Sequence, residues 1–100
     1  MIIYNVTVNI EKSIHDEWLI WIKNYIPQVL ATGKFTGAKL TKVLVEEEMG
    51  GTTYAIQYRA KSREALESYY KNDADKLNQD GLLKFTDKML TFRTELEIID

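Results

Sequence analysis

Alternation of apolar and polar side chains marks three segments of the chain: residues 2–10, 52–60 and 89–99. A period of two with many β-branched residues is typical of strands that bury one face. A further segment, 38–48, alternates less regularly, as in an edge strand or a strand with a bulge. Gly50-Gly51 follows it and predicts a hairpin turn, because both glycines can take positive φ. The pattern therefore predicts four strands.

Two other segments repeat apolar residues every three or four positions, the spacing of an amphipathic helix. The first covers 13–26, with Ser13 placed to cap its N-terminus. Pro27 should stop or kink this helix, because proline lacks the backbone N–H and crowds the preceding turn. A further turn is expected over 28–32, opening at Pro27, and Gly33 suits a left-handed stop.

The second helix is predicted over 62–80, with Ser62 as its N-cap and Gly81 as its end. The resulting order, β-α-β-β-α-β, is the ferredoxin-like arrangement of the α+β class. It predicts a four-stranded antiparallel sheet with two helices on one face. Right-handed crossovers place 2–10 and 52–60 in the centre of the sheet and the other two strands at its edges.

Aromatic side chains are concentrated on the sheet face that the helices would cover. The pattern places Leu90, Phe92 and Leu96 on this face, and Arg93, Glu95 and Glu97 on the other. Either these rings only pack the core, or some of them line a small-molecule pocket, since buried phenols need polar partners and often border a cavity. The pocket candidates are Tyr4, Trp18, Tyr25, Tyr54, Tyr58 and Phe92.

The opposite face of the predicted sheet is small, polar and weakly charged, and this fold provides no helices to cover it. Arg59 or Arg93 could pair there with Glu95 or Glu97. Closed two-fold pairing of identical faces is the commonest form of assembly, so we expect a homodimer formed through this face. The expected interface residues are Asn5, Thr7, Val43, Val45, Ala55 and Gln57.

Composition narrows the classes of function. The 100 residues suit one domain, 1–100, and the net charge of −2 gives no basic surface for nucleic acid. The absence of cysteine excludes disulfides and thiolate metal sites, and a lone histidine excludes a multi-histidine site within one chain. No signal peptide or membrane-length apolar run is visible. We therefore expect a cytoplasmic protein without metal, cofactor, membrane or nucleic-acid partner.

Few residues suggest chemistry. Histidine is the side-chain type best suited to act as a general base near neutral pH, but the single histidine, His15, lies in the first turn of the first helix and no nucleophile is spaced to meet it. If the protein is an enzyme, the catalytic candidates are His15, Tyr58 and Arg93. Three functions remain open: a homodimer that binds a small apolar or aromatic molecule, a cofactor-free enzyme of monooxygenase or isomerase type, and a protein-interaction or regulatory module.

Several motifs together resemble the DUF4286 family of small bacterial proteins, common in Bacteroidetes, over essentially all 100 residues. They are Tyr4-Asn5-Val6-Thr7-Val8-Asn9, Trp18-Leu19-x-Trp21, Ile26-Pro27, Ala31-Thr32-Gly33-x-Phe35, Thr53-Tyr54-x-x-Gln57-Tyr58 and Phe92-Arg93-Thr94. In that family a histidine often precedes the Ile-Pro pair, where this chain has Tyr25. The family has no established activity. Its architecture is similar to that of the dimeric α+β barrel proteins, which implies sheet-to-sheet dimers and a pocket between helices and sheet.

Overall fold

The computed structural model describes residues 1–44 and 50–100, apart from the side chain of Leu82. Within these ranges, the fold consists of four strands and three α-helices, with two short 3₁₀ turns. In chain order they are β1 (Ile2–Ile10), η1 (Lys12–Ile14), α1 (His15–Leu30), β2 (Phe35–Lys42), β3 (Thr52–Ala60), α2 (Arg63–Asn72), α3 (Ala74–Phe85), η2 (Thr86–Lys88) and β4 (Met89–Glu97). No helix in the described ranges is long and apolar enough to cross a membrane.

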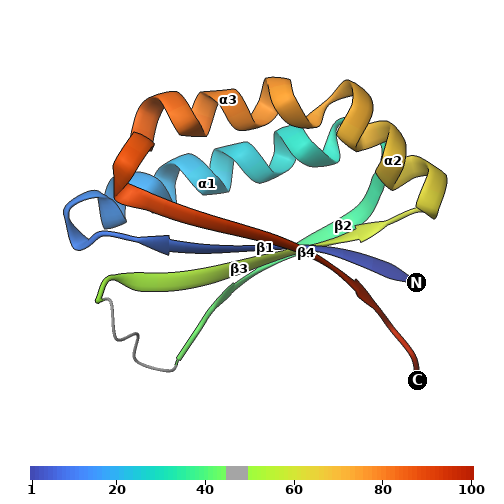
Figure 1. The fold of residues 1–100 in the computed structure, drawn as a ribbon, viewed down its shortest axis with the longest axis horizontal. Coiled ribbons are helices and arrows are strands. Elements are labelled where there is room, and N and C mark those ends of the chain that lie inside the picture. The colour runs from blue at the N-terminus through green and yellow to red at the C-terminus, as the bar shows by residue number, and fades with distance from the viewer. Residues whose placement is uncertain (45–49) are drawn as a thin grey trace.

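The sheet has the order β2-β3-β1-β4, and every neighbouring pair is antiparallel. Within the described residues, all the helices lie on one side of the sheet and no element covers the other side, called the bare face below (Figure 1). The ferredoxin-like α+β fold is thus confirmed, with β1 and β3 in the centre. The irregular second strand is an edge strand, and it has the predicted irregularity between Phe35 and Gly37. It spans Phe35–Lys42 and so begins before the predicted range of 38–48. Positions 45–48 of that prediction lie outside the described residues.

The start and the proline of α1 correct two predictions. Ser13 is not the N-cap of α1, because it lies in the 3₁₀ turn η1. The N-cap position is Ile14, which makes no side-chain capping hydrogen bond. Pro27 does not stop the helix, which runs to Leu30. The helix tolerates the one N–H that proline lacks, because the hydrogen bonds continue beyond it: the Ala31 N–H donates to the Pro27 carbonyl at 2.9 Å. The last turn is also stabilised by Val29, which is completely buried.

The second helical segment bends where the prediction has one continuous helix. Its start is confirmed, since the Ser62 hydroxyl accepts from the Ala65 N–H at 3.0 Å. The segment breaks at Asp73 and continues through Gly81 to Phe85, so Gly81 does not end it. Gly81 has a packing role, because a Cβ there would lie 2.8 Å from the ring of Trp21. Glycine lets α3 approach α1 at this point.

The faces of β4 are reversed relative to the prediction. Val6 lies opposite Arg93 and Val8 opposite Thr91, so Arg93 and Thr91 share the helix side of the sheet. Phe92 therefore points to the bare side and is 61% exposed. Period-two alternation is the same in both registers, and a slip of one residue exchanges the faces. The turn η2 sets the register, with the Glu11 N–H donating to the Lys88 carbonyl at 3.1 Å.

The core lies between the sheet and the helices and is built largely of rings. Trp18 is fully buried and stacks on Tyr54, with ring centroids 5.1 Å apart. Tyr4 stacks on Tyr58 at 5.9 Å and touches Tyr69 at 5.7 Å. These contacts join the two central strands to α1 and α2, so the aromatic residues connect the two layers.

Truncation of Trp18 tests this arrangement. We expect Trp18→Ala to lower the free energy of unfolding by about 3–5 kcal/mol, from lost burial and the cavity left behind. Ile20 lies on the same helix but is 67% exposed, so Ile20→Ala should cost less than about 0.5 kcal/mol. Urea unfolding followed by circular dichroism measures both. A loss below about 1 kcal/mol for Trp18→Ala would contradict the core described.

Candidate functional site

A cavity of about 50 Å³ lies between the helices and the sheet. Strands β1, β3 and β4 of the sheet provide one wall, and α1, α2 and α3 provide the other. The lining residues are Tyr4, Val6, Val8, Ile56, Tyr58, Met89, Thr91 and Arg93 from the strands, and Trp18, Trp21, Ile22, Tyr25, Tyr69, Asn78 and Gly81 from the helices. The cavity is therefore largely apolar, and its polar groups are four phenols, the Thr91 hydroxyl, the Asn78 amide, two indole N–H groups and the Arg93 guanidinium.

The phenols of the lining are buried and stay protonated at neutral pH. The Tyr25 hydroxyl donates to Asn78 Oδ1 at 3.0 Å, which links α1 to α3 across the cavity. Burial raises the pKa of Tyr25 to about 12. Burial also raises the pKa values of Tyr58 and Tyr69 well above the usual value for a phenol. These hydroxyls are neutral hydrogen-bond donors rather than bases.

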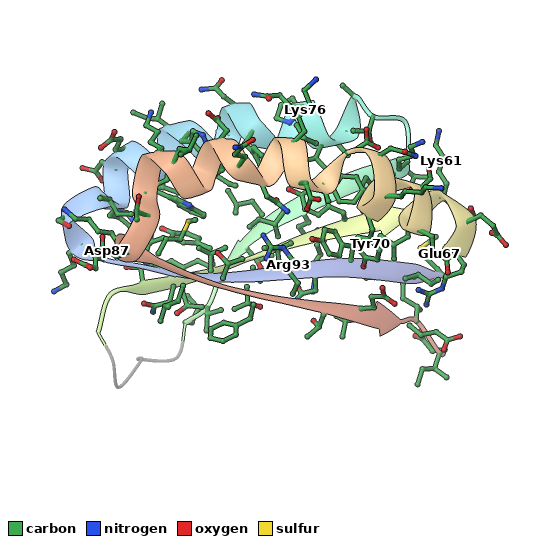
Figure 2. All side chains as sticks on the ribbon, turned by 45° about the horizontal axis from the view of Figure 1, so that its top comes forward. Lys61, Glu67, Tyr70, Lys76, Asp87 and Arg93 are labelled. Carbon is green, nitrogen blue, oxygen red and sulfur yellow. The ribbon has the colours of Figure 1, made fainter. Side chains whose placement is uncertain are left out.

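Arg93 stands at the edge of the cavity. It lines the cavity and also an outer hollow formed with Tyr4, Tyr70, Thr94 and Glu95. Figure 2 shows it between β4 and the helices, with Tyr70 of α2 further along the same gap. Burial raises the pKa of Tyr4, and the Arg93 guanidinium opposes that rise. Among the described residues, Arg93 forms no ion pair.

Both carboxylate oxygens of Glu95, two residues further along β4, accept a hydrogen bond. Its carboxylate accepts from Arg63 Nη1 at 2.7 Å and from the Tyr70 hydroxyl at 2.7 Å. These two donors, Tyr70 first, lower the pKa of Glu95. The contacts hold α2 against β4 beside the outer hollow. The predicted ion pair of Glu95 across the bare face is therefore wrong, because Glu95 lies on the helix side.

His15 lies apart from the cavity. Its Nε2 is 2.7 Å from the Tyr54 hydroxyl, and its Nδ1 is 3.0 Å from Asp16 Oδ1. Neither His15 nor Tyr54 lines the cavity. The structure thus brings Tyr58 and Arg93 to one site but leaves the third catalytic candidate outside it.

Four of the six pocket candidates line the cavity: Tyr4, Trp18, Tyr25 and Tyr58. Tyr54 does not, because its hydroxyl turns to His15, and Phe92 does not, because β4 presents it to the bare side. Sequence reasoning missed Asn78 and the position of Arg93. A strand register shifted by one residue would have placed Arg93 correctly, but no sequence signal singled out Asn78.

The bare face of the sheet carries the predicted polar residues and three large apolar ones that the prediction placed inside. By register, Asn5, Thr7, Ala55 and Gln57 lie on this face. The Val43 N–H donates to the Thr53 carbonyl at 2.8 Å, which extends the edge beside β3. Val45 lies outside the described residues. The additional apolar side chains are Leu90, Phe92 and Leu96, between 44% and 61% exposed.

Solved structures with the same fold are numerous but distant in sequence. A dimeric ferredoxin-like protein from an uncultured marine organism superposes with a TM-score of 0.74 at 10% identity, over 99% of this chain and 95% of that one. An ethyl tert-butyl ether D family protein from Bacillus halodurans gives 0.69 at 15% identity, over 99% and 100%. A Deinococcus radiodurans protein, proposed to be an antibiotic biosynthesis monooxygenase, gives 0.58 at 14% identity, over 100% and 94%.

At these identities the similarity shows the fold alone. The comparison with curated proteins finds no match. The comparison with family models matches residues 1–99 to the domain of unknown function DUF4286. That match covers nearly the whole sequence and agrees with the resemblance carried by the motifs. The chain belongs to the DUF4286 family.

Proposed function

We propose that this protein binds a small, largely apolar molecule in the cavity between the helices and the sheet. The observation that carries the proposal is the lining itself: aromatic and aliphatic side chains with a few polar groups that point to one space. Ligand sites in proteins commonly have this composition. The cavity has room for a few water-sized groups, so the molecule is small.

Binding without chemistry is favoured over catalysis. The described lining contains no carboxylate and no histidine, and its phenols hold their protons too tightly to act as bases near neutrality. The relative from Deinococcus radiodurans is the reason to keep monooxygenase chemistry as the alternative. In this chain such chemistry would have to use Tyr58 and Arg93 without His15.

We also propose that two copies pair through the bare face of the sheet. Leu90, Phe92 and Leu96 form an apolar stripe there, beside the small residues Thr7 and Ala55. Several large apolar side chains exposed side by side favour contact with another protein surface. Two of the structural relatives are described as dimeric ferredoxin-like proteins. A stable pair should bury about 1,200 Å² or more in total.

A variant that fills the cavity tests the binding function. Val6 is half-buried and lines the cavity, so Val6→Phe should block it and abolish binding, while Val6→Ala should keep it open. The chain's two tryptophans, Trp18 and Trp21, both line the cavity, so their fluorescence reports its occupancy. We expect at least one member of a panel of small acids, alcohols and amides to change this fluorescence in the native protein. If no member does, or if folded Val6→Phe binds equally well, the function is refuted.

A charged substitution on the apolar stripe tests the dimer. Light scattering of the native protein should give a mass near 23.2 kDa, twice the 11.6 kDa of one chain. Phe92→Glu should give the monomer mass, because a carboxylate at the centre of the interface cannot be desolvated. Ile20→Glu, on the exposed side of α1, is the matched control and should remain dimeric. A native monomer, or a dimer of Phe92→Glu, would show that this face is not the interface.

The buried phenols predict a loss of stability in alkali. An unfolded phenol ionises near pH 10, whereas Tyr25 in the folded protein keeps its proton up to about pH 12. Its contribution to stability is therefore complete below about pH 10 and falls by up to roughly 1.4 kcal/mol per pH unit between these values. Urea unfolding between pH 8 and 11 measures this slope. Tyr25→Phe should make the slope shallower, and an unchanged slope would contradict the burial of this hydroxyl.

A further inference from the structure

On the basis of the proposed binding function, we propose that the molecule bound in the cavity is a short-chain organic anion. Its charged group would bind Arg93 at the edge of the cavity. Its apolar tail would lie between the tyrosine and tryptophan rings inside. The proposal narrows the ligand from a small apolar molecule to a carboxylate or similar oxyanion with a tail of about three to five heavy atoms.

Arg93 is solvent-exposed at the edge of the cavity and has no carboxylate partner within the described residues. Glu95 lies on the same side of the same strand, but Arg63 and Tyr70 occupy both of its oxygens, each at 2.7 Å. Asp80, on α3, accepts from Trp21 Nε1 at 3.2 Å. Neither carboxylate pairs with Arg93, and no other ion pair to it occurs within the described ranges. A guanidinium beside an apolar space attracts an anion, because its fork of N–H groups matches a carboxylate.

Polar groups of the cavity lining also favour an anion. Tyr4 and Arg93 both line the cavity and the outer hollow next to it. Trp18 Nε1 is buried and donates to no described atom. An unsatisfied buried donor is unfavourable, and Trp18 lines the cavity. The lining therefore combines a positive charge and an unpaired N–H donor with hydroxyls that can also donate, which suits an occupant rich in acceptor oxygens.

The volume of the cavity limits the length of the ligand's tail. The cavity is about 50 Å³, and a water-sized group needs roughly 10–15 Å³ on this scale. About three to five heavy atoms therefore fit. An engineered cavity of about 150 Å³ is the kind that holds benzene, so a whole aromatic ring requires movement of the lining. An aliphatic tail is favoured over a ring.

Three probes of graded chemistry test the proposal. Butyrate has the charge and the tail, 1-butanol has the tail without the charge, and benzoate has the charge with a ring. Binding is followed by tryptophan fluorescence and by two-dimensional NMR, in low-chloride buffer at pH 7. We expect native protein to bind butyrate at least about tenfold more tightly than 1-butanol, with benzoate weaker than butyrate.

Arg93→Gln removes the charge and should weaken butyrate binding by about 10- to 100-fold, while 1-butanol binding stays unchanged. Lys76→Gln is the matched control, because Lys76 is exposed on α3 and points away from the sheet (Figure 2). It makes the same change of charge and should leave both affinities unchanged. Since both the guanidinium and the carboxylate remain ionised from pH 6 to 8, native butyrate affinity should be flat over this range.

The outcomes separate this inference from the proposed function. If 1-butanol binds as tightly as butyrate, or if Arg93→Gln binds butyrate like the native protein, the anion is refuted while the cavity keeps its binding function. If benzoate binds more tightly than butyrate, the short tail is refuted. If none of the probes and no member of the wider panel binds, both proposals fall together.

Discussion

Pairing of β1 along its whole length with two neighbours is the constraint on which the rest of this structure depends. β1 pairs with β3 from Ile3 to Ile10 and with β4 from Ile2 to Ile10. These two ladders fix which residues of three strands share a face. The helix side then receives the tyrosines of β1 and β3 together with Arg93 of β4, and the bare side receives Phe92. The cavity and the proposed interface both follow from this one register.

Aromatic rings and branched aliphatic side chains share the space between the layers, and both kinds line the cavity. Trp21 stacks on Tyr25 with centroids 4.6 Å apart and meets Phe85 edge-on at 5.5 Å. Rigid planar groups cannot adapt to an irregular space as aliphatic chains do. Gly81 lets α3 come close to the Trp21 ring, yet the space toward β4 stays open. The polar ends of the rings and Arg93 meet there.

The two faces of the sheet divide the proposed functions. One face holds the cavity, and the other offers an apolar stripe on an edge strand beside small polar residues. Because adjacent residues of β4 point to opposite faces, Arg93 and Phe92 connect the ligand site and the proposed interface through a single peptide unit.

The order and type of the elements follow from local patterns in the sequence. Period-two alternation predicts β1 and β3 with their observed bounds. Spacings of three and four predict the helical segments, and Ser62 marks the start of α2. Four cavity tyrosines and tryptophans were also identified, namely Tyr4, Trp18, Tyr25 and Tyr58. These features depend on local chemistry and on burial patterns that a single chain segment displays.

The faces of β4, the length of α1 and the role of Gly81 depend on packing between elements. An alternating strand reads the same in two registers, so the pairing with β1 and the turn before β4 had to choose between them. The proline in α1 was overridden because burial of Val29 stabilises the turn beyond it. Gly81 reads locally as a helix end, but the ring of Trp21, sixty residues earlier in the chain, gives it a packing role. For the faces of β4 and for Gly81, the deciding contact joins residues far apart in sequence, and no local pattern contains it.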